Sequence, residues 1–134
     1  RRSDLPTAGG PGALVIDGDD GYLPSRTAPH IYKIDLAGWR VVRGTDDPII
    51  AYLGEGNQLT SMVMAGQGRA YVTAFNQDAV YVFDTGCDAS VAGPFDVGKG
   101  GLLEGPIDIA YDEAGRTAYT LLSISSAISV ISDP

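Results

Sequence analysis

Residues 69–85 of the chain read RAYVTAFNQDAVYVFDT, and this stretch decides the fold class. It holds two runs, Tyr71–Thr73 and Val80–Phe83, that are rich in β-branched and aromatic residues. Such residues favour the pleated, half-buried surface of a β-strand. Between the runs lies Asn76-Gln77-Asp78, whose polar side chains are typical of a turn. The stretch therefore predicts two antiparallel strands joined by a short turn.

The strand pattern repeats along the chain with a nearly fixed period. Ile31–Asp35, Val80–Asp84 and Ile128–Ser132 all carry apolar residues at their first and fourth positions, and their starts are evenly spaced. The pair Ala70-Tyr71 recurs at the same spacing as Ala118-Tyr119, and a Gly-Arg pair shortly precedes each of them. Two independent markers thus indicate one structural repeat with a period of about 50 residues.

Within the middle repeat we predict four strands, at residues 58–65, 69–75, 79–84 and 89–97, and no window shows the 3.6-residue apolar period of a helix. Four antiparallel strands every 40–50 residues or so are the signature of a β-propeller blade. The fold class is therefore all-β, with about two and a half to three blades present. Closed propellers have typically 4–8 blades, so we expect these residues to be part of a larger propeller.

The repeat also predicts the domain organisation. Residues 1–12 form an irregular N-terminal segment, and residues 13–57 form a partial blade with a long loop insert. Residues 58–105 form a complete blade, and residues 106–134 form a second partial blade. An isolated open stack exposes strand edges, which natural proteins avoid. The missing partners of these edges are expected on the same polypeptide or on other protein chains.

Residues 69–85 resemble the YVTN family of β-propeller repeats, whose motif runs Gly-x-x-x-Tyr-Val-Thr-Asn, a polar turn and a strand ending in Asp-Thr. In this chain Ala74 replaces the motif's Asn, and Asp84-Thr85 closes the repeat. The third repeat has Tyr119-Thr120-Leu121 in place of Tyr-Val-Thr, and the first keeps only residues 13–17 and the strand at Ile31. The resemblance implies a seven-bladed propeller that is exported to the periplasm or the cell surface.

Composition excludes several classes of function. The chain has 134 residues and a net charge of −8, so it lacks the basic stripe of a nucleic-acid-binding domain. The longest uncharged run, residues 117–132, is sixteen residues long and rich in Ser and Thr, whereas a membrane-spanning helix needs about 20 mainly apolar residues. The single cysteine, Cys87, forms no internal disulfide; it is either a small side chain without a redox role or the point of attachment to a partner.

Long loops indicate where a binding site lies. We expect residues 18–30, 44–57 and 98–105 to be loops on one face of the blades, and binding residues concentrate in long loops on a rigid scaffold. This face is mostly acidic, and Tyr22 could anchor a partner. The partner-binding residues that we predict are Asp19, Asp20, Tyr22, Arg26, His30, Asp46, Asp47, Glu55, Lys99 and Glu104.

Metal and catalytic sites find little support. The run Asp17-Gly18-Asp19-Asp20-Gly21 spaces its carboxylates like a calcium loop, but its fifth residue is Gly21 and no closing Glu follows, so a tight turn explains it equally well. His30 is the only histidine, no serine lies in a Gly-x-Ser-x-Gly elbow, and Gly98–Gly101 is not a phosphate-binding loop. We predict no metal, no cofactor and no catalytic residue.

Two functions remain from different classes. The first is a non-catalytic interaction or scaffold module of an exported or cell-surface assembly. The second is part of a propeller enzyme similar to lactonases, streptogramin-type lyases or the large subunits of amine dehydrogenases, with a site on the central channel. Catalytic groups that converge on the channel from other blades would favour the second, since function lies in the site and not in the fold.

Overall fold

The computed structural model describes residues 2–5, 10–42, 49–54, 57–98 and 103–132. These residues form twelve β-strands and one turn of 3₁₀ helix, and they contain no α-helix. No helix in this part of the chain is long and apolar enough to cross a membrane. The predicted all-β class is confirmed, and the strands assemble into three antiparallel sheets.

The central sheet contains β6 (Leu59–Met64), β7 (Arg69–Ala74), β8 (Ala79–Asp84) and β9 (Ala89–Asp96), hydrogen-bonded in that order. The four predicted strands agree with these bounds to within one residue at each end. The turn between β7 and β8 is a 3₁₀ helix, Phe75–Gln77, which ends at Asp78 in the left-handed region with φ of 49°. Asp and Asn tolerate that conformation better than most residues, which suits the polar turn of the repeat.

The first sheet contains β1 (Val15–Asp17), β2 (Asp20–Pro24) and β3 (His30–Asp35), followed by two short strands. These are β4 (Arg40–Val41) and β5 (Ile49–Tyr52), and both pair with the outer edge of β3. Together β4 and β5 occupy the place that β9 occupies in the central sheet, as a fourth strand in two pieces.

The predicted loop insert at residues 18–30 is wrong, and so is the unbroken connection at residues 44–57. Gly18 and Asp19 form one turn, the strand β2 follows at Asp20–Pro24, and residues 25–29 then connect β2 to β3. Likewise, β5 lies inside the second segment. The Gly- and Asp-rich sequence around Gly18 is typical of a loop, but here it makes the tight turn of the β1–β2 hairpin, as Asp-Gly sequences often do.

The third sheet contains β10 (Pro106–Asp112), β11 (Thr117–Leu122) and β12 (Ala127–Ser132). The β11–β12 pairing runs from Thr117 opposite Ser132 to Leu122 opposite Ala127 without a shift in register. No strand of the described residues pairs with the outer edge of β12.

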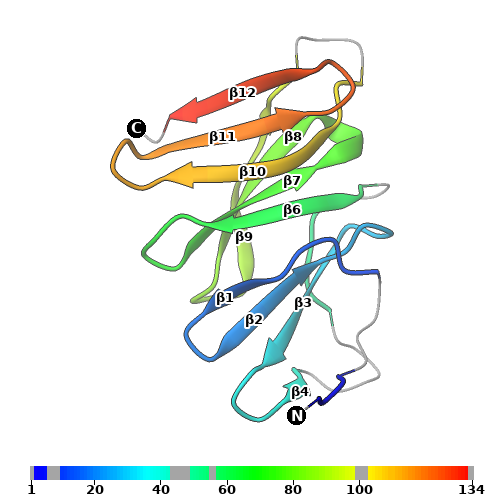
Figure 1. Cartoon of the computed structure of the whole chain (residues 1–134), viewed down its shortest axis with the longest axis vertical. Helices are drawn as coiled ribbons and strands as arrows, with labels where there is room; N and C mark the ends of the chain where they lie inside the picture. Colours follow the sequence, from blue (N-terminus) through cyan, green and yellow to red (C-terminus); the bar gives the residue numbers. More distant parts are fainter. Residues whose placement is uncertain (1, 6–9, 43–48, 55–56, 99–102, 133–134) are drawn as a thin grey trace.

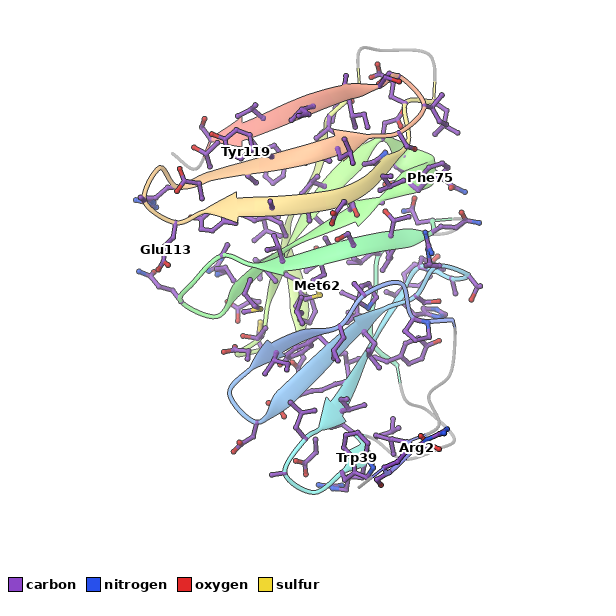
Figure 2. All side chains as sticks on the ribbon, viewed as in Figure 1. Arg2, Trp39, Met62, Phe75, Glu113 and Tyr119 are labelled. Carbon is purple, nitrogen blue, oxygen red and sulfur yellow. The ribbon has the colours of Figure 1, made fainter. Side chains whose placement is uncertain are left out.

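The three sheets stack face to face, with β6 lying between β1 and β10 (Figure 1). One apolar cluster joins the first sheet to the central one and includes Tyr22, Ile31 and Phe83. Met62 points from β6 into this junction (Figure 2). A second cluster, which includes Tyr71 and Val80, joins the central sheet to the third. The first and the central sheets therefore each bury apolar residues against the next sheet along the chain.

Candidate functional site

Equivalent positions in the three repeats form the side of each sheet that points toward the next sheet, which we call the forward face. Its residues are Tyr22, Ile31 and Lys33 in the first sheet, Tyr71, Val80 and Val82 in the central sheet, and Tyr119, Ile128 and Val130 in the third. The three tyrosines follow one another at the spacing of the repeat, so Tyr22 is the repeat tyrosine of the first sheet.

A polar cluster closes the junction between the first and central sheets. The Tyr22 ring packs edge-on against Phe83, with ring centroids 5.6 Å apart, and its hydroxyl donates a hydrogen bond to Asp88 Oδ1 at 3.1 Å. Lys33 Nζ lies 3.0 Å from Asp88 Oδ2 and 3.4 Å from Asp20 Oδ2. It also lies 5.4 Å from the centre of the Tyr22 ring, within the range of a cation–π interaction.

The cluster raises the pKa values of the Tyr22 phenol and the Lys33 ammonium group. Burial raises the pKa of Tyr22 to about 12, and the Asp88 carboxylate acts in the same direction while Lys33 opposes it. Burial by itself lowers the pKa of Lys33, but the hydrogen bond to Asp88 and the contact with Tyr22 outweigh burial and raise that pKa above its ordinary value. Lys33 is therefore a cation and Tyr22 a neutral hydrogen-bond donor at neutral pH.

A second polar contact crosses the same junction. Thr85 Oγ1, at the end of the repeat motif, donates a hydrogen bond of 2.6 Å to Asp17 Oδ2. Two carboxylates of the calcium-like run, Asp17 and Asp20, thus interact with Thr85 and Lys33 of the protein itself. Within the described residues, no group of three or more His, Cys, Asp or Glu side chains is arranged to hold a metal ion.

The predicted partner-binding residues do not share one face. Asp19 and Asp20 lie at the β1–β2 turn, whereas Arg26 and His30 lie at the opposite end of the strands, around the β2–β3 turn. The reason is the unpredicted strand β2, since each additional strand moves the following turn to the other end of the sheet.

Two of the predicted residues are buried. Tyr22 is only 1% exposed, so it cannot act as an exposed anchor, and Glu104 is 7% exposed in the segment that precedes β10. His30 is half-buried between the rings of Tyr32 and Tyr52. The remaining predicted residues, Asp46, Asp47, Glu55 and Lys99, lie outside the described residues.

The junction between the central and third sheets contains a cavity of about 870 Å³. Val82, the counterpart of Lys33, lines this cavity together with Tyr71, whose ring is 5.7 Å from that of Tyr111. The other lining residues come from the start of β7, from β9 and β12, and from the turns at one end of the sheets, and they are Ala65, Gly66, Gln67, Arg69, Ala92, Phe95, Glu113, Arg116, Ile131 and Ser132. The volume lies within the range of ligand pockets.

The forward face of the third sheet is exposed. Tyr119 is 43% exposed, whereas its counterpart Tyr71 is 7% exposed; Ile128 is 66% exposed, whereas its counterpart Val80 is fully buried. Figure 2 labels Tyr119 on β11, in the last sheet of the stack. Leu121 and Val130 are exposed beside them. In the first and central sheets, the corresponding side chains pack against the next sheet along the chain.

Sequence reasoning missed this surface and the cavity, although a signal for the surface was present. The tyrosine spacing places Tyr119 at the same position as two tyrosines that pack against the next sheet. Cys87, in contrast, lies exposed in the β8–β9 turn and not in a core.

No family model matches the chain, and no curated protein sequence matches it. Among solved structures, the chain is similar to hydrazine synthase of Kuenenia stuttgartiensis, with a TM-score of 0.68 and 21% identity over 98% of this chain and 34% of that one. It is also similar to a putative 6-phosphogluconolactonase of Bacteroides uniformis, with a TM-score of 0.68 and 13% identity over 92% of this chain and 39% of that one.

A third similar structure is the C-terminal WD40 domain of Sif2, with a TM-score of 0.57 and 14% identity over 87% of this chain and 32% of that one. The chain therefore spans about a third of the length of each of these three structures. At these identities the likeness concerns the fold alone, and both enzymes and a WD40 domain share it. The fold of this chain is that of β-propeller blades.

Proposed function

We propose that this chain is a non-catalytic interaction module, of the YVTN repeat type, in an exported or cell-surface protein assembly. The observation that carries the proposal is the exposed forward face of the third sheet. The partner that this face fits is another blade-like sheet, because the corresponding faces of the first and central sheets are covered by such a sheet.

The chemistry of the face supports docking. Fully burying a large apolar side chain contributes about 1.5–3 kcal/mol, and four such side chains, Tyr119, Leu121, Ile128 and Val130, are each exposed here by 43% or more. Asp19 and Arg26, which the sequence predicts as partner contacts, are exposed at the two ends of the first sheet, which the central sheet separates from this face.

Localisation outside the cytoplasm belongs to the same proposal. It rests on the resemblance of residues 69–85 to the YVTN repeat and on the acidic composition, which suits a soluble surface protein. Fractionation of source cells followed by detection of the chain tests it. The expected result is recovery in the periplasmic or surface fraction, and recovery in the cytoplasm contradicts it.

The docking proposal is tested with the double variant Ile128→Lys/Val130→Lys and the matched control Ser125→Lys/Ser126→Lys, which places the same charge in the neighbouring β11–β12 turn. Each protein is cross-linked in an envelope extract and analysed by size. Wild type and control are expected to form the same cross-linked complex, and the forward-face variant is expected to lose it while keeping the circular dichroism of wild type. A complex that survives the forward-face substitutions contradicts the proposal.

The second candidate is catalytic. Its specific support is that two structural neighbours carry enzyme names, hydrazine synthase and a putative 6-phosphogluconolactonase. Turnover of a lactone or amine substrate by the purified chain, lost on substitution of a charged cavity residue such as Glu113→Gln, would favour this candidate over the interaction module.

A further inference from the structure

A glycine stands where the chain passes from the first sheet to the central sheet. Gly54 lies two residues after β5 and has a φ of +91°, a conformation that favours glycine. A Cβ atom at this position would lie 3.3 Å from Asn57 Nδ2, 3.4 Å from Gln77 Nε2 and 3.7 Å from the Tyr81 hydroxyl oxygen. Because glycine has no side chain, a space remains between these three polar groups, and we call this space the Gly54 gap.

Two amide nitrogens border the gap. Asn57 donates a hydrogen bond of 2.7 Å from Nδ2 to the carbonyl oxygen of Leu53, which holds the amide beside Gly54. The Tyr81 hydroxyl donates to Oε1 of Gln77, so the oxygen of the Gln77 amide is occupied and its nitrogen is the end that borders the gap. An amide nitrogen carries two N–H donors. Hydrogen-bond donors from two side chains therefore border the Gly54 gap.

The Asn57 amide also carries an acceptor without a partner. Asn57 is 1% exposed, and its Oδ1 accepts no hydrogen bond within the part of the chain that the structure describes. The large majority of buried polar side-chain atoms in native proteins have a hydrogen-bond partner. This oxygen therefore needs a donor that the described residues do not supply.

A hollow of about 300 Å³ adjoins the gap through Gln77. It is lined by Gln77, Ala79, Pro94 and Asp96, so Gln77 borders both the gap and the hollow. Ala79 and Pro94 form an apolar wall, and Asp96 is the charged group among the described lining residues. Its Oδ1 accepts a hydrogen bond of 2.8 Å from the backbone N–H of Gly98, which orients the carboxylate and leaves the other oxygen for a ligand.

A β-bulge in β9 shapes the apolar wall. The register shifts where Gly93 and Pro94 of β9 lie opposite Tyr81 alone. Gly93 has a φ of +101°, and a Cβ there would lie 2.8 Å from the carbonyl oxygen of Val80, so glycine lets β9 approach β8 this closely. Bulges are over-represented beside active sites, where they redirect a side chain. Here the bulge brings Pro94 into the lining of the hollow.

The donors and acceptors of the site select a class of ligand. A hydroxyl group both accepts and donates, so it can accept from the amide N–H groups of Asn57 and Gln77 and donate to Asn57 Oδ1. An ammonium group only donates and would meet two amide nitrogens, whereas a phosphate or carboxylate only accepts and would meet the carboxylate of Asp96. A second hydroxyl can donate to Asp96 in a charge-assisted hydrogen bond. The set therefore fits two neighbouring hydroxyl groups of a neutral molecule.

We propose that the Gly54 gap and the adjoining hollow bind a small neutral polyol of the monosaccharide type. One hydroxyl lies between the amides of Asn57 and Gln77, a neighbouring hydroxyl donates to Asp96, and C–H groups pack against the apolar wall. The volume of about 300 Å³ is at the lower limit of ligand pockets, which suits a ligand of this size.

The described residues build this site from both of the sheets that meet there. Leu53 of the first sheet's end and Leu59 of β6 pack in the same apolar cluster as Ala79 and Tyr81. The inference goes beyond the proposed docking function, because the site uses no residue of the forward face of the third sheet.

Side-chain amide signals of a ¹⁵N-labelled sample report directly on the site. The chain has two asparagines and three glutamines, so these signals are few. Titration with D-glucose, D-galactose and D-mannose is expected to shift the signals of Asn57 and Gln77 in a saturable way for at least one sugar. The signal of Gln67, which lies in the β6–β7 turn, is expected to stay unchanged. Glucose 6-phosphate and ethylamine, the anionic and ammonium probes, should bind about tenfold more weakly or worse.

A conservative variant tests the placement of the ligand. Gln77→Glu keeps the oxygen that accepts from Tyr81 but replaces the amide nitrogen that borders the gap. It is expected to weaken sugar binding by about tenfold or more while keeping the wild-type Tm. The matched control is Gln58→Glu, which adds the same charge at an exposed residue just before β6 and should leave sugar binding unchanged.

Each contrary result overturns a stated part of the inference. No shift with any of the three sugars at about 100 mM, where ligands with millimolar Kd values are bound, overturns the polyol site. Tighter binding of ethylamine or glucose 6-phosphate than of the sugars overturns the neutral ligand class, and equal binding by Gln77→Glu and wild type overturns the placement at the Gly54 gap. Loss of the forward-face complex leaves these titrations unchanged, so failure of the proposed function and failure of this inference are distinguishable.

Discussion

Removal of the Lys33 charge should destabilise the junction between the first and central sheets. Lys33→Met keeps most of the side-chain volume but leaves the carboxylates of Asp20 and Asp88 without the cation that lies between them. The Lys33 side chain is 14% exposed and that of Asp88 is 31% exposed, so this pair lies between the surface and buried classes. Surface pairs contribute about 0–1 kcal/mol, whereas breaking a buried pair costs about 3–5 kcal/mol.

We therefore expect Lys33→Met to lower the free energy of unfolding by about 2 kcal/mol, measured by urea denaturation at pH 7. Adding Asp88→Asn should restore part of the loss, because it removes one of the two unpaired carboxylates. Asn suits this position, since Asp88 has a φ of 53° and Asn tolerates the left-handed region. The double-mutant cycle is expected to give a coupling energy of about 1 kcal/mol.

The matched control is Arg40→Gln, which breaks a pair of similar geometry, with Nε 3.3 Å from Asp35 Oδ2 but with the arginine side chain 69% exposed. It should change stability by less than about 0.5 kcal/mol. If Lys33→Met costs no more than Arg40→Gln, or if Asp88→Asn restores nothing, the cluster does not hold the two sheets together and the reasoning is refuted.

Three further predictions concern pH and backbone conformation. The pKa of Tyr22 is raised from 10.0 to about 12, so the unfolded chain loses this proton at lower pH than the folded chain. The resulting contribution to stability, on the order of 3 kcal/mol at most, is complete below pH 10 and is lost between pH 10 and 12. Tyr22→Phe should therefore flatten the alkaline fall in stability measured by urea denaturation. The backbone N–H of Gly86 donates a hydrogen bond to Asp84 and lowers the pKa of this carboxyl below 3.8. The contribution of Asp84 to folding stability is therefore present above pH 3.8 and lost in acid. The Tm of Asp84→Asn should fall less steeply than that of wild type below about pH 4, and an unchanged dependence of Tm on acid pH would contradict this. Gly105→Ala should lower the free energy of unfolding by about 2–3 kcal/mol, because φ is +69° and the added Cβ would lie 2.6 Å from the Phe75 ring. Gly18→Ala is the control: its φ is +61° but its Cβ would lie in open space, so it should cost about 1 kcal/mol. Equal losses of the two variants in thermal unfolding would show that the contact with the Phe75 ring is unimportant.

Local patterns predicted the central sheet well. Its four strands end in polar or glycine-containing turns, and the alternation of apolar residues has the two-residue period of a pleated strand. The first sheet was harder because Asp17–Gly21 has the composition of a loop, although its residues complete one strand, turn and begin the next. Missing β2 then placed Asp19 and His30 on one face, since the end at which a turn emerges depends on the number of strands before it.

The amino-acid sequence by itself determined the repeat period, the strands of the central sheet and the positions that alternate between the two sides of a sheet. Only the tertiary structure decided what those positions do. Tyr22, Tyr71 and Tyr119 occupy the same place in the repeat, yet the first two are buried and the third is exposed. The pleat directs each ring to the forward face, but a ring is removed from water only where another sheet packs against that face. For the same reason, the cavity between the central and third sheets emerges only when these sheets are stacked.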